Sequence, residues 1–79
     1  MDDGTVMARR RAFGRRVASL RRERGLSQEK LALNAGLDRS YMGRIERGEV
    51  SVSLDKIWGI ADALGVAPGD LFAGESDAG

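Results

Sequence analysis

Arginine and lysine side chains supply most of the binding chemistry available to this chain of 79 residues. Twelve of its 13 basic residues lie between positions 9 and 47 with only four acidic residues, so this segment carries a formal charge of +8. Residues 48–79 carry one lysine and six acidic residues, and the net charge of the chain is only +1. Guanidinium groups bind phosphate and base edges through parallel hydrogen bonds. The segregated charge therefore predicts that the basic segment attracts a polyanion while the acidic part faces away from it.

Several kinds of chemistry are excluded by composition. Cysteine and histidine are absent, which removes disulfides, thiol nucleophiles, the usual zinc ligand sets and histidine bases. The carboxylates do not follow the spacing of a calcium-binding loop, so we expect no metal, no cofactor and no small-molecule ligand. No apolar run approaches the roughly 18 residues of a membrane span, and residues 1–8 do not resemble a secretory signal. We therefore expect a cytoplasmic protein with no membrane partner and no enzymatic activity.

The elements that must position the basic residues are all predicted to be helical. Phe13, Val17 and Leu20 recur at helical spacing and indicate one apolar stripe on a first helix. Ser27 and Asp38 are suitable N-caps for the next two helices. The predicted helices span residues 8–24, 28–35, 39–47 and 54–64, followed by a short fifth helix from Pro68 to Phe72. We expect a flexible arm over residues 1–8, one domain over residues 9–73 and a disordered tail over residues 74–79.

The segment from Gln28 to Arg47 meets the steric requirements of a helix-turn-helix. Two helices that cross at a steep angle need a small residue where they touch, and Ala32 occupies that place. The turn needs a residue that tolerates positive φ, as Gly36 does. Apolar residues that can anchor both helices recur at suitable spacings, namely Leu31, Ala35, Leu37, Met42 and Ile45. Together these features predict a DNA-binding helix-turn-helix.

The chain from about Phe13 to Phe72 resembles the five-helix domain of lambdoid phage repressors and bacterial Xre-type regulators. The resemblance is carried by residues 20–28 (LRRERGLSQ), by the helix-turn-helix, and by residues 60–66 (IADALGV). Residues 37–42 (LDRSYM) and 45–48 (IERG) are particularly similar to the controller proteins of restriction–modification systems, which are stand-alone dimers of about this length. The resemblance implies an all-α, five-helix, lambda-repressor-like fold that binds double-stranded DNA.

The sequence departs from the controller proteins directly after the third helix. Those proteins usually carry a basic and an amide side chain there, which approach the DNA backbone or minor groove. Residues 49–52 read EVSV in this chain, so that contact is lost and Glu49 would oppose phosphate.

The third helix is expected to enter the major groove with its N-terminal half toward the base edges. Arginine can pair with guanine through two hydrogen bonds, and serine can contact a base or a phosphate. Gly43 could let the helix approach DNA closely or serve packing alone, because a glycine in mid-helix is otherwise unfavourable. The predicted base-reading residues are Arg39, Ser40, Gly43 and Arg44.

Phosphate contacts are expected from Gln28, Asn34, Tyr41 and Arg47. Gln28 begins the second helix, whose N-terminus favours an anion, and its counterpart in the family clamps the DNA backbone. Gln28 could instead be an ordinary surface residue, and Tyr41 could pack on the second helix. Arg47 favours the helix dipole whether or not DNA is bound.

The resemblance also assigns structural roles. The family pairs a glutamate of the third helix with an arginine of the first, and the matching residues here are Arg21 and Glu46. This pair implies a semi-buried salt bridge that holds the helix-turn-helix on its scaffold. The remaining arginines of the first helix could lie over the DNA backbone or form a solvated face.

A homodimer is expected because one recognition helix reads too few base pairs to find a site in a genome. The fourth and fifth helices form the predicted interface, with Trp58, Leu71 and Phe72 as its candidate residues. Each of these side chains could instead belong to the core.

The sequence thus predicts a sequence-specific transcriptional regulator that binds a pseudopalindromic operator as a homodimer. RNA polymerase is a further candidate partner, through an exposed acid such as Asp38 or Glu49. The alternative is a protein-interaction module, such as an antitoxin or adaptor, in which DNA binding is secondary. An RNA-binding adaptor is less favoured because the sequence offers no aromatic stacking platform.

Overall fold

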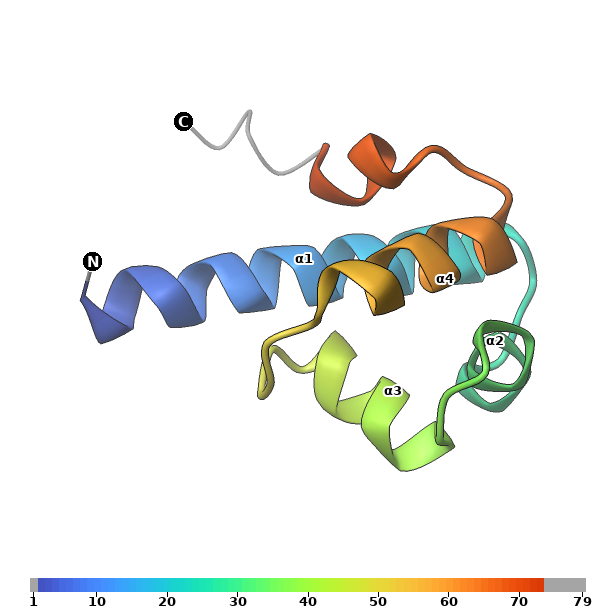
Figure 1. Ribbon diagram of the computed structural model, residues 1–79, viewed down its shortest axis with the longest axis horizontal. Coiled ribbons are helices and arrows are strands. Elements are labelled where there is room, and N and C mark those ends of the chain that lie inside the picture. The colour runs from blue at the N-terminus through green and yellow to red at the C-terminus, as the bar shows by residue number, and fades with distance from the viewer. Residues whose placement is uncertain (1, 74–79) are drawn as a thin grey trace.

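The computed structural model describes residues 2–73 of the chain. This part contains the helices α1 (Asp3–Glu23), α2 (Gln28–Ala35), α3 (Arg39–Glu46) and α4 (Leu54–Leu64), and the short 3-10 helix η1 (Pro68–Phe72). Figure 1 shows α1 running along the molecule, with α2 and α3 on one side and η1 on the other. The all-α fold class is confirmed for these residues. The expected tail over residues 74–79 lies outside the described residues.

The described residues form four α-helices and a 3-10 helix, so the expectation of five α-helices is wrong in its last element. The N-cap position of η1 is Ala67, which has no side-chain oxygen to accept a hydrogen bond from the helix. Its backbone instead accepts at 2.9 Å from the Asp70 N–H, three residues on, and its own N–H donates to Asp70 Oδ2 at 3.2 Å. Five residues with this i to i+3 bonding are typical of a 3-10 turn.

The first helix begins at Asp3, so residues 3–8 are helical and do not form the expected flexible arm. Asp2 caps the helix, because its Oδ1 accepts a hydrogen bond of 2.7 Å from the Thr5 N–H. The same bond lowers the pKa of the Asp2 carboxyl below its ordinary value. A carboxylate at this end also favours the helix dipole. The local acidic residues therefore extend α1 beyond its apolar stripe.

The two helices of the helix-turn-helix begin and end through local bonds. Ser27 Oγ accepts from the Lys30 N–H at 3.0 Å at the start of α2, as its position predicts. At the other end, Gly36 has φ +73° and the Leu37 N–H donates to the Ala32 carbonyl at 2.8 Å, which closes the helix. Asp38 precedes α3 with extended backbone but makes no side-chain capping bond. α3 ends at Glu46, one residue before the predicted end.

One core lies between all the elements. Its largest fully buried side chains are Leu31, Met42, Ile45, Ile60, Leu71 and Val17. Leu71 has no exposed surface and packs in this cluster, so the prediction that it forms part of a dimer interface is wrong. The backbone of η1 turns this side chain inward under α1 and α4, both of which contact η1.

Gly14 sets the distance between α1 and α3. A Cβ atom at this position would lie 2.5 Å from the Glu46 carbonyl oxygen, and the neighbouring contacts are also backbone atoms. Backbone cannot yield as a flexible side chain can, so α1 reaches the C-terminal end of α3 only because this residue is glycine. This close crossing places the C-terminal end of α3 directly against α1.

Candidate nucleic-acid interface

The outer face of α3 brings together most of the predicted DNA-contacting residues. Arg39, Ser40 and Arg44 are exposed there, while Gly43 is buried. A shallow hollow on this face, called the α3 hollow below, is lined by Gln28, Arg39, Ser40, Gly43, Arg44 and Arg47. All four predicted base-reading residues and two of the four predicted phosphate-contacting residues therefore share one surface.

Gly43 lets side chains from two elements meet over α3. A Cβ atom at Gly43 would lie 3.1 Å from Arg47 Nη1 and 3.6 Å from Gln28 Oε1. Both neighbouring atoms are the ends of flexible side chains. Because Gly43 has no side chain, the Arg47 guanidinium and the Gln28 amide can lie close to each other over this part of α3.

The Glu46 carboxylate ties three helices together beneath this surface. Its Oε2 accepts from Arg21 Nε at 2.7 Å, and its Oε1 accepts from Arg21 Nη2 at 3.1 Å. The same Oε1 accepts from Gln28 Nε2 at 2.8 Å, a bond that the sequence did not predict. Arg21 also donates from Nη1 to the Leu26 carbonyl at 2.9 Å. The Arg21 and Glu46 side chains are only 12% and 6% exposed, so this predicted pair lies in a largely dry site.

This network fixes Gln28 in a defined orientation. One N–H of its side-chain amide donates to Glu46, and the same nitrogen carries a second N–H that can donate to another acceptor. Gln28 is also the first residue of α2, next to the Ser27 cap. The N-terminus of a helix favours an anion because its first N–H groups lack intrahelical partners. The position therefore offers both backbone and side-chain donors at the edge of the α3 hollow.

Arg47, a predicted phosphate contact, is held by a carboxylate of its own chain. Its Nε donates to Glu49 Oε2 at 2.7 Å and its Nη2 donates to Glu49 Oε1 at 3.2 Å. These bonds lower the pKa of the Glu49 carboxyl and raise that of the Arg47 guanidinium. The charge of Arg44 lowers the pKa of Glu49 further. The sequence placed Glu49 against phosphate but did not predict its pairing with Arg47.

Tyr41 and Asn34, the weaker phosphate candidates, do not line the α3 hollow. The Tyr41 hydroxyl donates to the Ser51 carbonyl at 3.4 Å, and the Lys56 ammonium lies 5.3 Å from the centre of its ring. Tyr41 therefore packs toward the segment after α3 and toward α4. Asn34 is exposed on α2, and the structure gives no contact that assigns it to this surface.

Arg15, Arg16 and Arg22 of α1, with Arg24 directly after it, form two groups that the sequence could not separate. Arg16 donates to the Asp70 carbonyl at 2.8 Å, and Arg24 donates to the Leu64 carbonyl at 2.6 Å, so both bind the C-terminal elements. Arg15 and Arg22 instead line a second hollow beside the α3 hollow, together with Gln28 and other residues. These two arginines extend the basic surface from α3 onto α1.

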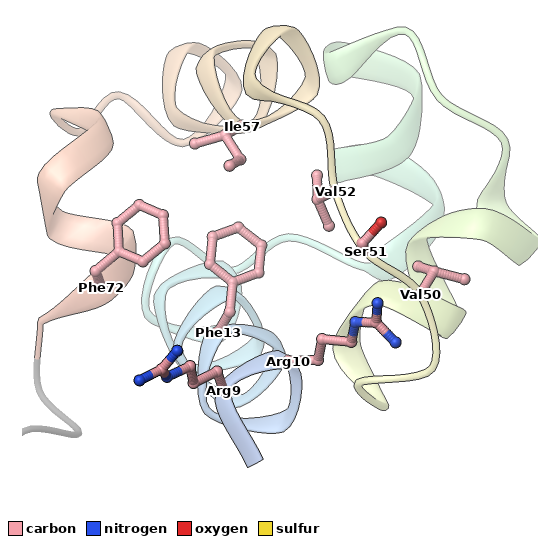
Figure 2. A pocket seen from close by; sticks show the side chains of 8 residues that line it. All are labelled: Arg9, Arg10, Phe13, Val50, Ser51, Val52, Ile57 and Phe72. Atoms are coloured by element: carbon pink, nitrogen blue, oxygen red, sulfur yellow. The ribbon is translucent and has the colours of Figure 1, made fainter. Parts of the chain in front are cut away.

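Two exposed aromatic side chains lie on α4 and η1. Trp58 and Phe72, two of the predicted interface residues, are 52% and 58% exposed. Figure 2 shows the Phe72 and Phe13 rings beside each other in a groove that Ile57 also lines, and the two ring centres are 5.2 Å apart. Arg9 and Arg10 stand at the rim of the same groove. Trp58 and Phe72 thus remain available for the predicted interface, unlike Leu71.

Residues 2–73 offer neither a cluster of metal ligands nor a helix able to span a membrane. No group of three or more histidine, cysteine, aspartate or glutamate side chains is placed to hold a metal ion in this range. None of the helices described combines the length and the apolar character that crossing a membrane requires.

Comparison with known proteins gives consistent matches. A family model described as a helix-turn-helix domain matches residues 12–73. The control protein C.BamHI of Bacillus amyloliquefaciens is 49% identical over 61 residues, which cover 76% of this chain and 75% of that protein. The uncharacterized HTH-type transcriptional regulator y4dJ of Sinorhizobium fredii is 35% identical over 65 residues, covering 82% and 84% of the two chains. The crystal structure of the restriction-modification controller protein C.AhdI from Aeromonas hydrophila superposes with a TM-score of 0.81 at 51% identity, covering 82% of this chain and 98% of that one.

Proposed function

This chain belongs to the helix-turn-helix family of DNA-binding transcription regulators, and on that premise we propose that it binds a pseudopalindromic operator in double-stranded DNA as a homodimer. The observation that carries the proposal is the α3 hollow, where exposed arginines of α3 meet the N-terminus of α2. An exposed helix with cations on its outer face and donors at its edge suits the major groove and the adjacent phosphates.

Base reading is assigned to the outer face of α3. Arg39 and Arg44 would each direct a guanidinium at a guanine, and Ser40 would donate to a base or a phosphate. Because Gly43 has no side chain, α3 could approach the DNA closely there, so that the neighbouring side chains reach the base edges. Each good arginine–guanine pair discriminates against a wrong base by about 1–3 kcal/mol.

Phosphate binding is assigned to Gln28 and the start of α2. The second N–H of its amide and the first N–H groups of α2 can donate to one phosphate. Glu46 holds the amide at 2.8 Å and so orients this clamp before DNA arrives. Phosphate contacts fix the register of the protein on the duplex without reading sequence.

A homodimer is proposed through α4 and η1. These elements contact each other and carry the exposed Trp58 and Phe72 side chains. They also belong to the acidic part of the chain, which would face away from DNA. Trp58→Ala should lower the dimer fraction in sedimentation analysis without unfolding the protein, because Trp58 is half exposed. An unchanged dimer fraction in this variant would remove the proposed interface.

We further propose that the operator controls a restriction–modification system. Support comes from the similarity to C.BamHI and to the C.AhdI structure, nearly all of which this chain covers. The departure at residues 49–52 means that the contact after α3 differs from that of other controller proteins. If bound protein activates transcription, Asp38 and Glu49 are exposed acids that RNA polymerase could contact.

The test is selection of binding sites from a random duplex library at near-physiological salt. The wild-type protein should enrich an inverted repeat, and the Arg39→Ala/Arg44→Ala variant should not. Folding of the variant is checked by circular dichroism, since both side chains are exposed and their loss should leave the core intact. Binding without enrichment, or no binding, would refute a sequence-reading regulator and favour the alternative of a protein-interaction module.

A further inference from the structure

The Arg47–Glu49 pair lies at the edge of the α3 hollow, outside the predicted base-reading residues. Both Glu49 oxygens accept from Arg47, at 2.7 and 3.2 Å, so the carboxylate faces the fork of the guanidinium. The remaining nitrogen, Nη1, points toward Gly43, where a Cβ atom would lie 3.1 Å away. The guanidinium is therefore held against the recognition helix by a side chain of the same loop.

The pair is placed to change how this surface binds a polyanion. Glu49 lowers the effective positive charge of Arg47, because both of its carboxylate oxygens are bonded to that guanidinium. Because the pKa of the Glu49 carboxyl lies below its ordinary value, the group stays ionised at neutral pH. The Arg47 and Glu49 side chains are 58% and 49% exposed, so water or phosphate can reach the pair without unfolding the chain.

We propose that Glu49 limits the affinity of this protein for DNA by occupying Arg47, so that a phosphate must displace a carboxylate of the protein before it can bind there. This inference rests on the proposed binding of DNA by the α3 hollow. A free arginine at this position would release a counterion from DNA when it binds phosphate, and a paired one contributes little net charge. Displaced Glu49 also remains near the phosphate as a like charge.

The contact that Glu49 weakens carries no sequence information. Phosphates are present at every site, so a free Arg47 would strengthen operator binding and non-specific binding by the same factor. Non-specific sites greatly outnumber operators in a genome. A carboxylate that occupies Arg47 therefore keeps more of the protein off non-specific DNA without altering base recognition by Arg39 and Arg44.

The variant that tests this is Glu49→Gln, which removes the charge but keeps an oxygen that can accept from Arg47. Dissociation constants are measured for the selected operator and for an unrelated duplex between 50 and 200 mM salt. We expect Glu49→Gln to bind both duplexes about 3- to 10-fold more tightly at 100 mM salt. The slope of log K against log salt should become steeper by about 0.9, so the gain should shrink about 3.5-fold across this salt range.

Two controls separate the role of Arg47 from a general change in charge. Asp62→Asn makes the same charge change at an exposed position on α4, outside the α3 hollow, and should leave both affinities within about 2-fold of wild type, because salt screens an exposed charge that touches no phosphate. The Arg47→Ala/Glu49→Gln variant should return to wild-type affinity and salt slope, because no arginine remains at position 47 to bind phosphate.

The outcomes distinguish this inference from the proposed function. Wild-type protein that binds no duplex would refute DNA binding itself. Wild-type protein that binds its operator while Glu49→Gln shows no gain would overturn only the role of Glu49. The inference is also overturned if the double variant keeps the gain, because Glu49 would then act without Arg47, or if the gain is confined to the operator.

Discussion

Replacing Glu46 with alanine perturbs the contact that joins three helices at a single carboxylate. The substitution removes the acceptor for Arg21 Nε and Nη2 and for the Gln28 amide. Arg21 keeps its bond to the Leu26 carbonyl, but its charge is left without a partner in a site where the side chain is only 12% exposed. Water cannot fully replace the lost carboxylate there.

The expected loss of stability follows from that burial. Removing one partner of a buried ion pair costs about 3–5 kcal/mol, because the other charge stays buried and uncompensated. The remaining Leu26 bond and the partial exposure of Arg21 place this case at about 3 kcal/mol. In a domain of 60–100 residues each kcal/mol lowers Tm by roughly 4–8 °C, so Glu46→Ala should lower Tm by roughly 12–24 °C.

Thermal and urea denaturation followed by circular dichroism measure this effect. Protein concentration is held constant, since the stability of a dimer depends on it. Glu49→Ala is the matched control, because it removes a carboxylate from an arginine in an exposed pair and should leave Tm nearly unchanged. A wild-type Tm in Glu46→Ala, or equal losses in the two variants, would refute the role assigned to the buried pair. Operator binding should weaken in Glu46→Ala even well below its Tm, because Gln28 loses its anchor.

Three substitutions test the packing around the same surface. Gly14→Ala should destabilise the protein by at least about 1–3 kcal/mol in urea denaturation, because its Cβ would meet the Glu46 backbone oxygen, whereas Gly4→Ala, whose Cβ lies 3.5 Å from its nearest neighbour, should be neutral or stabilising. Leu71→Ala should cost about 2–5 kcal/mol as a core truncation, and a loss of dimer without a loss of monomer stability would contradict its burial. Gly43→Ala should fold with unchanged or raised Tm yet bind the operator more weakly, because its Cβ would project from the face of α3 that carries Arg39, Ser40 and Arg44; unchanged affinity would show that a Cβ is tolerated there.

The bounds of two helices were predictable because their signals are local. α2 and α4 have the predicted bounds, since a serine caps each start and a glycine with positive φ follows each end. The start of α1 was not predicted correctly. The apolar stripe that indicated this helix begins only at Phe13, whereas the cap formed by Asp2 starts the helix ten residues earlier. The last helix was predicted in place but not in type, as five residues after a poorly capping alanine cannot extend beyond a 3-10 turn.

Most residues of the candidate site were predictable, and the family resemblance supplied the Arg21–Glu46 pair, but two other pairings were not predictable. Spacing along α3 placed Arg39, Ser40 and Arg44 on one exposed face, as helical periodicity requires. The bond from Gln28 to Glu46 joins residues 18 positions apart, and no local pattern specifies it. Arg47 and Glu49 are close in sequence, but their bonding depends on how the chain turns after α3.

The sequence by itself determined the all-helical class, the helix-turn-helix and the separation of a basic segment from an acidic one. These properties depend on residue type and on spacings of a few residues, which act before any tertiary contact forms. The tertiary structure alone decided that Leu71 is buried while its neighbour Phe72 is exposed, and that α1 crosses α3 at Gly14. Burial and close approach depend on which distant elements pack on a given face. That packing depends on all the core residues at once and on no local pattern.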